Sequence, residues 1–236
     1  MTGSLGAKAG MAAEPARGVL PGGCMAVIAV KQRSHGKSHL AECLSLAERV
    51  GLIRTMLDRV IEASEGAALL SGAMVVSPER DTVAARIPVL EDAGAGMNEA
   101  FDLARVALRL QGVRMMAALP ADLPGLRASD LDALVRAAGE GGVAIAPDGR
   151  GTGTNALVCP VALPMTFRFG PDSCRRHAEE ARLLGIEPAL VKRPGLSFDV
   201  DLPADLQCLE PPSPAPPSSG NGGRAQESVP VPVRCP

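Results

Sequence analysis

Short apolar runs alternate along this chain with longer amphipathic stretches, and this alternation limits the fold more than any other feature. We expect strands at 25–30 (MAVIAV), 72–77 (GAMVVS), 113–119 (VRMMAAL), 142–147 (GVAIAP) and 156–160 (ALVCP). We expect helices over 38–64, broken near Gly51, and over 97–111, 128–140 and 172–185. Apolar strands separated by helices predict an α/β fold, in which a mainly parallel sheet is covered by helices on both faces.

The length and composition favour one core between two extensions. A chain of 236 residues, 46% of them hydrophobic, is sufficient for one sizeable α/β domain. Residues 1–24 are small, polar and non-periodic, and residues 210–236 are rich in Pro, Ser and Gly. We therefore predict a flexible N-terminal extension over 1–24, a single folded domain over 25–209 and a disordered tail over 210–236.

The residue usage argues against several classes of protein. Aromatic residues make up 2% of the chain and the formal net charge is -2, so a basic, stacking surface for nucleic acid is not expected. The chain has no apolar stretch of membrane-spanning length and no signal-peptide layout, which predicts a cytoplasmic protein without a membrane partner. The scattered cysteines favour buried, reduced thiols over a zinc site, and His177 is expected on a helix face.

Two lysines follow the first expected strand. The stretch from Met25 contains Gly36-Lys37-Ser38, but the phosphate-binding P-loop pattern requires a glycine five positions before Gly36, where Lys31 stands. Lys31 and Lys37 are nevertheless two of only four lysines in the chain. Their position at one strand end favours contact with phosphate over a role as solvated surface charge.

Three aspartates form a second group of candidate site residues, and one of them follows an expected strand. Ligands of parallel sheets bind beyond the carboxyl ends of the strands, and Asp122 follows the strand at 113–119. If the stretch around Val200 is also a strand, Asp199 and Asp201 point to the same side while Val200 faces the core. Carboxylates without His or Cys suit Mg²⁺. The alternative is that Asp201 caps a helix that starts at Pro203, which leaves Asp199 unexplained.

Two further segments contain groups that bind anions. The stretch 149–157 (GRGTGTNAL) offers flexible backbone N–H groups and hydroxyls that could cradle an anion, or it is simply a hairpin loop. The stretch 168–173 (RFGPDS) precedes a helix, whose N-terminus attracts anions. Ser173 would present a hydroxyl there, or would act only as the N-cap of that helix.

Taken together, these blocks resemble one enzyme family. The stretches AVKQRSHGKSHLA, VVSPERD, GAGMNEAFDLA, ADLPGL, APDGRGTGTNAL, FRFGPDSCRRHAEEA and PGLSFDVDLPADL occur in this order from about Met25 to Leu206. In this respect the chain is similar to the CofC/FbiD guanylyltransferases of coenzyme F-420 biosynthesis. The resemblance implies a nucleotide-diphospho-sugar transferase-like fold. It also implies a reaction that joins GTP to a phosphorylated three-carbon acid with release of pyrophosphate; a downstream F-420 transferase then uses the product.

The resemblance also implies roles for individual residues. Asp122, Asp199 and Asp201 are expected to bind Mg²⁺, and Thr154, Gly170 and Ser173 are expected to hold the phospho-acid, largely through backbone N–H groups. Lys31 and Lys37 would contact the GTP phosphates, and Asn98 would lie near the nucleoside. Because the nucleophile is already an anion, we expect catalysis through Lys31, Lys37 and Asp122 by positioning and charge compensation.

Two other functions and the identity of the acid stay open. The first alternative is another nucleotidyltransferase of the same fold, acting on molybdopterin or a sugar phosphate, although the LxxGxGxR-type loop that usually opens such enzymes is absent. The second is an inactive nucleotide-binding regulator, which predicts loss of one of the three aspartates. The acid is phosphoenolpyruvate, 3-phospho-D-glycerate or 2-phospho-L-lactate, and small apolar differences of this kind are discriminated by only about 1–3 kcal/mol.

Overall fold

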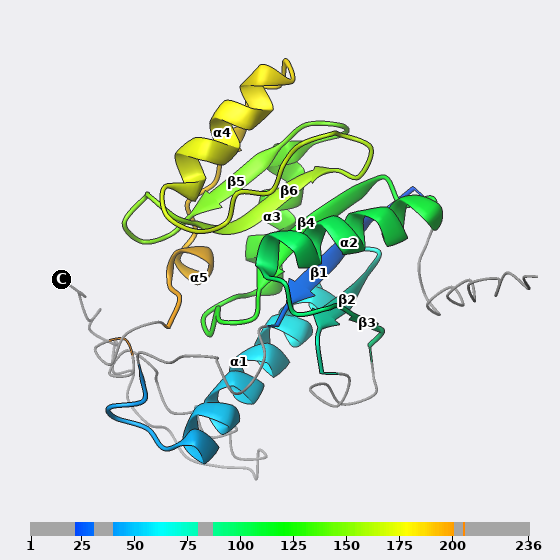
Figure 1. Ribbon diagram of the computed structural model, residues 1–236. Helices are drawn as coiled ribbons and strands as arrows, with labels where there is room; N and C mark the ends of the chain where they lie inside the picture. Colours follow the sequence, from blue (N-terminus) through cyan, green and yellow to red (C-terminus); the bar gives the residue numbers. More distant parts are fainter. Residues whose placement is uncertain (1–21, 31–39, 80–86, 201–204, 206–236) are drawn as a thin grey trace, which may run out of the picture.

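The computed structural model describes residues 22–30, 40–79, 87–200 and 205 (Figure 1). Within these ranges seven strands form one sheet in the order β3-β2-β1-β4-β6-β5-β7. The strands are β1 (Cys24–Ala29), β2 (Gly72–Ser77), β3 (Val89–Glu91), β4 (Met115–Pro120), β5 (Ala144–Pro147), β6 (Thr154–Pro160) and β7 (Ala189–Leu190). The first strand thus starts inside the predicted N-terminal extension, whereas residues 1–21 and the whole predicted tail over 210–236 lie outside the described residues.

The sheet is mainly parallel, as predicted, with one reversed strand. β1 pairs in parallel with β2 and β4, β2 with β3, and β5 with β7, whereas β6 runs antiparallel to both β4 and β5. β6 is reversed because the short segment 148–153 joins it to β5 as a hairpin, whereas a parallel connection requires a long crossover. Consequently the first residues of β6 lie at the edge of the sheet where β4 and β5 end.

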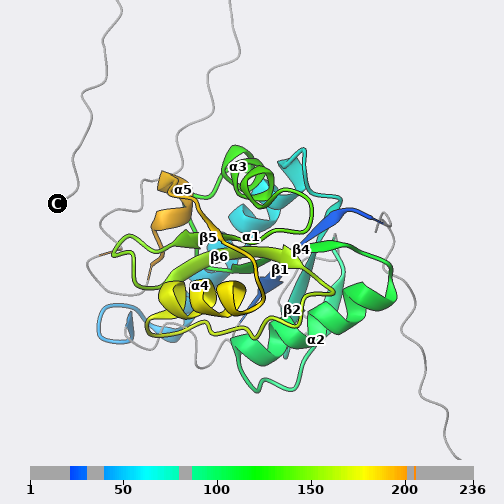
Figure 2. The ribbon, with the colours of Figure 1, turned by 90° about the horizontal axis from the view of Figure 1, so that it is seen from above.

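Helices cover both faces of this sheet (Figure 2). α1 (Leu46–Gly66) and α3 (Ala128–Ala138) pack on one face, and α2 (Met97–Leu110) and α4 (Ser173–Leu183) pack on the other. β1 shows the alternation that divides the core in two: Ala26 and Ile28 contact the first pair of helices, and Met25 and Val27 contact the second. The predicted three-layer α/β architecture is confirmed.

The prediction for the first helix is wrong at two points. α1 begins at Leu46, and residues 40–45 precede it as a turn; it then continues unbroken through Gly51. The start is set by Ser45, whose hydroxyl accepts from the Glu48 N–H while the Glu48 carboxylate accepts from the Ser45 N–H, forming a capping box. A single interior glycine costs about 1 kcal/mol, which a helix of 21 residues tolerates when one of its faces is buried.

The segment that contains Asp199 also differs from its prediction. Residues 198–200 belong to no strand, so no pairing with a neighbouring strand sets the directions in which their side chains point. Val200 is nevertheless fully buried, as predicted, and packs with Ile53 and Met56 of α1. The segment is preceded by a short helix, α5 (Pro194–Ser197), which sequence periodicity did not predict.

Three of the four described cysteines are buried, as predicted, and one is not. No helix within these ranges is both long and apolar enough to cross a bilayer. Cys24, Cys159 and Cys174 are buried free thiols, and Cys43 is an exposed one. Burial raises the pKa of Cys24 and of Cys159 to about 12, so both stay protonated and act as small apolar side chains.

Candidate active site

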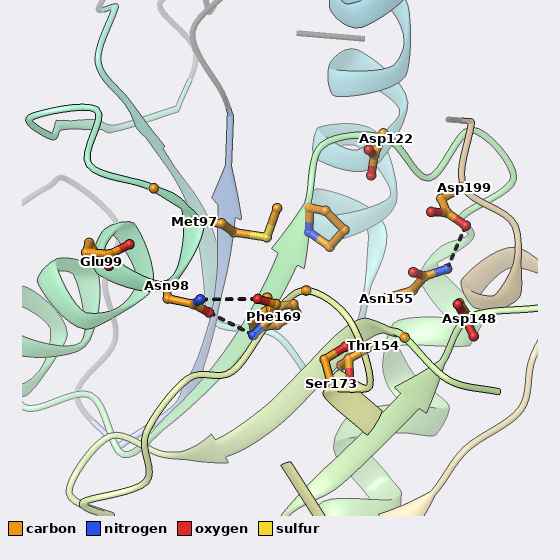
Figure 3. A pocket seen from close by; sticks show the side chains of 14 residues that line it. Met97, Asn98, Glu99, Asp122, Asp148, Thr154, Asn155, Phe169, Ser173 and Asp199 are labelled. Carbon is orange, nitrogen blue, oxygen red and sulfur yellow. Dashed lines mark hydrogen bonds between the residues drawn. The ribbon is translucent and has the colours of Figure 1, made fainter. Parts of the chain in front are cut away.

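A pocket of about 440 Å³ opens at the edge of the sheet where β4 and β5 end and β6 begins. Its volume is typical of a site for small molecules. Polar side chains from five separate segments line it (Figure 3): Asn98, Glu99, Asp122, Asp148, Thr154, Asn155, Ser173 and Asp199.

The strand order brings these segments together. β4 ends at Pro120, two residues before Asp122, and β5 ends at Pro147, directly before Asp148. Thr154 is the first residue of β6 and pairs with Pro147. β6 lies between β4 and β5 and runs in the opposite direction, so it begins at the edge of the sheet where they end. Residues of all three strands therefore meet at the pocket, at the carboxyl ends of parallel strands, where open α/β sheets bind ligands.

Two of the three predicted metal ligands line this pocket. Asp122 and Asp199 lie on the same side of it in Figure 3, together with Asn155 and Asp148. The side-chain amide of Asn155 donates to Asp199 Oδ1 at 3.5 Å, a long contact that keeps this carboxylate facing β6. Carboxylate and amide oxygens fit a hard cation such as Mg²⁺.

The predicted triad is not complete in the described part of the chain. Asp201 lies outside it, and the described residues include no cluster of three His, Cys, Asp or Glu side chains that could hold a metal ion. Lys31 and Lys37, the predicted GTP contacts, also lie outside the described residues. Their roles stay predictions.

The glycine-threonine loop is a hairpin loop whose last residues also line the pocket. The Asp148 N–H donates to the Gly153 carbonyl at 3.1 Å, and Asp148 Oδ1 accepts from the Thr152 N–H at 2.9 Å. A β-carbon on Gly153 would lie 2.7 Å from Asp148 Oδ2, so a side chain at this position would displace the Asp148 carboxylate. Asp148 thus shapes the turn, and the hairpin interpretation is confirmed. Thr154 lines the pocket, and the role of this loop as an anion cradle stays a prediction.

The alternative that Ser173 acts only as the N-cap of its helix is excluded. Asp172, with φ 55°, is the N-cap of α4 and makes no capping bond with its side chain, while Ser173 is the first helical residue. The Ser173 N–H donates to the Gly170 carbonyl at 3.2 Å, and the Cys174 N–H donates to the Thr152 carbonyl at 3.0 Å. Both of these N–H groups therefore already have acceptors, and the buried Ser173 also lines the pocket.

Asn98 holds the segment that leads to Gly170. Its side-chain carbonyl accepts from the Phe169 N–H at 2.8 Å, and its amide nitrogen donates to the Phe169 carbonyl at 3.2 Å (Figure 3). Gly170 follows with φ 129°, a conformation that L side chains rarely adopt. Asn98 lines the pocket, but both of its amide atoms already bind the backbone, and its place near the nucleoside stays a prediction.

Four residues at or near this site were not predicted as functional: Glu99, Asp148, Asn155 and His177. Asp148 follows a strand end and Asn155 follows Thr154, so their positions in the sequence were a usable signal. His177 was expected on a helix face, but it is fully buried. Its Nδ1 lies 3.0 Å from Thr154 Oγ1, a contact between residues 23 positions apart that local pattern does not reveal.

Comparison with solved structures defines the class of fold. The chain superimposes with a TM-score of 0.65 on a provisionally named nucleotide-diphospho-sugar transferase of Desulfovibrio desulfuricans G20, at 14% identity, covering 78% of this chain and 84% of the other. It superimposes with a TM-score of 0.55 on a nucleotidyl transferase of Methanothermobacter, at 18% identity, covering 78% and 94%. The fold is that of the nucleotide-diphospho-sugar transferases.

Sequence comparison gives the family. Residues 24–210 match the family described as "Guanylyl transferase CofC like". The chain is 36% identical over 204 residues to phosphoenolpyruvate guanylyltransferase of Sphaerobacter thermophilus, covering 84% of this chain and 98% of the relative. It is 36% identical over 188 residues to 3-phospho-D-glycerate guanylyltransferase of Phenylobacterium zucineum, covering 76% and 86%. The chain belongs to the CofC-like guanylyltransferases, and is therefore a nucleotidyltransferase.

Proposed function

We propose that this protein joins GTP to a phosphorylated three-carbon acid, phosphoenolpyruvate or 3-phospho-D-glycerate, and releases pyrophosphate in the biosynthesis of coenzyme F-420. One observation carries the proposal: a single pocket combines the carboxylates of Asp122 and Asp199 with the hydroxyls of Thr154 and Ser173. The carboxylates suit a cation, and the hydroxyls suit a phosphate or carboxylate group. The names of the relatives supply the two acids.

In the proposed reaction, a phosphate oxygen of the acid attacks the α-phosphorus of GTP. The new P–O bond forms as the bond from the α-phosphorus to the oxygen that bridges to the β-phosphorus breaks, and pyrophosphate leaves with that oxygen. The attacking oxygen is already an anion, so the step needs no general base. Catalysis therefore consists of holding two polyanions in contact and compensating their charge.

Charge compensation is the main requirement. Two unit charges about 4 Å apart repel by about 1 kcal/mol in water and by several times that in a drier site. A Mg²⁺ ion, when bound, would supply positive charge that stabilises the charge gathering on pyrophosphate. Asp122 and Asp199 would hold the ion from the described side of the pocket, with Asp201 as the expected third ligand. Lys31 and Lys37 are proposed to neutralise the remaining phosphate charge.

The acid would occupy the part of the pocket between β6 and the start of α4. Thr154 and Ser173 are both more than nine-tenths buried there and line the pocket with Gly170. We assign the nucleoside to the side of α2 near Asn98. The proposal includes a cytoplasmic site of reaction and delivery of the product to the F-420 transferase that follows.

A substrate matrix tests the proposal. Pyrophosphate release is measured with GTP, ATP or CTP, each with phosphoenolpyruvate, 3-phospho-D-glycerate, 2-phospho-L-lactate or a sugar 1-phosphate, in the presence of Mg²⁺. The partner transferase and the deazaflavin precursor are added to trap the product. We expect release only with GTP and a phospho-acid. Release with a sugar 1-phosphate and with none of the acids would favour the sugar-nucleotidyltransferase alternative. The absence of release in every combination would favour an inactive regulator.

A further inference from the structure

His177 uses both of its ring nitrogens inside the protein. Its Nε2 accepts a hydrogen bond from the Arg168 backbone N–H at 2.8 Å, and its Nδ1 lies 3.0 Å from the Thr154 hydroxyl. The side chain projects from α4 and is fully buried, with the Phe169 ring packed edge-on at 4.8 Å between centroids. This histidine therefore joins the Thr154 side of the pocket to the segment before Gly170.

The hydrogen-bond partners fix which nitrogen carries the proton. A backbone N–H can only donate, so Nε2 must be unprotonated to accept from Arg168. Burial, assisted by the Arg168 charge and opposed by the Glu180 carboxylate, lowers the pKa of His177 to about 4, so the ring is neutral near pH 7. The one remaining ring proton is then on Nδ1, and Nδ1–H donates to Thr154 Oγ1.

We infer that His177 is a positioning residue that makes Thr154 a hydrogen-bond donor toward the pocket. Because the Thr154 oxygen accepts from the ring, its own proton is available for an acceptor on the bound ligand. This inference rests on the proposed function, since the ligand it addresses is the phosphorylated acid. It adds that an anionic oxygen of the acid, and not a donor group, faces Thr154.

The same ring also supports the backbone beside Gly170. His177 holds the Arg168 N–H, and Asn98 holds the adjacent Phe169 N–H and carbonyl, so two side chains from α4 and α2 hold consecutive peptide groups. A test must therefore separate the effect of His177 on Thr154 from its effect on this segment.

A matched pair of substitutions makes that separation. In His177→Gln the side-chain amide reaches the position of Nε2, so it can accept from the Arg168 N–H but no longer donates to Thr154. In His177→Asn the amide nitrogen occupies the position of Nδ1, so it can donate to Thr154 but no longer reaches Arg168. Thr154→Val removes the hydroxyl at nearly constant volume and serves as the reference.

Steady-state pyrophosphate release measures the outcome. We expect Thr154→Val and His177→Gln each to raise the KM of the acid roughly 10-fold, as expected for loss of a hydrogen bond to a charged group, with the KM of GTP changed less than about twofold. His177→Asn should stay within about threefold of the wild type. Since His177 acts through Thr154, His177→Gln should add less than about twofold in the Thr154→Val background. Multiplicative effects in the double variant, or a larger loss in His177→Asn than in His177→Gln, would overturn the inference.

A second measurement does not depend on the reaction. The ¹⁵N chemical shifts of the imidazole nitrogens report the tautomer directly, and His177 is one of only three histidines, so His177→Gln assigns its signals. We expect a neutral ring with the proton on Nδ1 at pH 7. A proton on Nε2, or a charged ring, would overturn the inference even if the enzyme is active. The expected tautomer together with no pyrophosphate release from any acid would refute the proposed function and leave the Thr154–His177 geometry intact.

Discussion

Replacing Asn98 by alanine removes both hydrogen bonds that hold the Phe169 backbone. These bonds join Asn98 Oδ1 to the Phe169 N–H at 2.8 Å and Asn98 Nδ2 to the Phe169 carbonyl at 3.2 Å. A typical intramolecular hydrogen bond contributes about 1 kcal/mol to stability, so the loss of two lowers the free energy of unfolding by about 2 kcal/mol. In a domain of this size such a loss lowers Tm by about 4–8 °C.

The same substitution should also weaken binding of the acid. Gly170 follows Phe169 directly and lines the pocket, so a looser Phe169 displaces the groups that face the acid. Urea unfolding gives the stability, and pyrophosphate release gives the KM of the acid and of GTP. The exposed Arg109→Ala on the same helix is the control and should change stability by less than about 0.5 kcal/mol.

The result that would refute this reasoning is specific. If Asn98→Ala unfolds like the wild type and raises only the KM of GTP, the Phe169 contact is energetically unimportant. Asn98 would then contact the nucleoside directly and would not position the segment before Gly170. A loss of stability with a raised KM for the acid and an unchanged KM for GTP supports the role as a clamp.

Three further substitutions test the framework of the site. Gly195→Ala places a methyl group against the Asp130 carboxylate and the Gly125 carbonyl, and thermal unfolding should show a loss of about 1–3 kcal/mol. Gly170→Ala forces a side chain into φ 129° with open space around it, so backbone strain of about 1–3 kcal/mol should lower Tm without a steric clash. His177, whose folded pKa of about 4 lies below its usual value of 6.5, binds its proton more weakly in the folded state. Its contribution to the free energy of unfolding is therefore present above pH 6.5 and is lost as the pH falls towards 4. Urea titrations should show that the wild type loses at most about 3 kcal/mol more than His177→Gln over this range. An equal pH dependence of the two proteins would contradict the lowered pKa.

The sequence predicted the layers of the fold because its signals are periodic and long. Four helices and five strands carry clear apolar patterns, and the alternation of β1 appears in the structure as two separate faces of the core. β3, β7 and α5 span three, two and four residues, which is too short for a pattern to be distinguished from chance. The reversal of β6 depends on the turn at 148–153, whose hairpin reading was one of two that the sequence allowed.

The candidate site was predictable where position in the chain determines it. Asp122 follows β4 and Thr154 begins β6, and both line the pocket. The position of Asp199 was predicted from a strand that does not form, and α5 and the burial of Val200 place it instead. His177 escaped prediction because its role depends on a contact across the fold, and a histidine in an amphipathic helix has no local sign of burial.

The most direct test of the account is the effect of the two pocket carboxylates on turnover. Asp122→Asn and Asp199→Asn keep the size of each side chain and remove its charge, and Glu140→Gln, an exposed carboxylate that does not line the pocket, is the control. Pyrophosphate release from GTP, Mg²⁺ and the preferred acid should fall at least about 100-fold in each aspartate variant, because charge stabilisation in the transition state is worth several kcal/mol. Tm should stay close to that of the wild type, and Glu140→Gln should be fully active. Wild-type turnover in either folded aspartate variant would contradict the account.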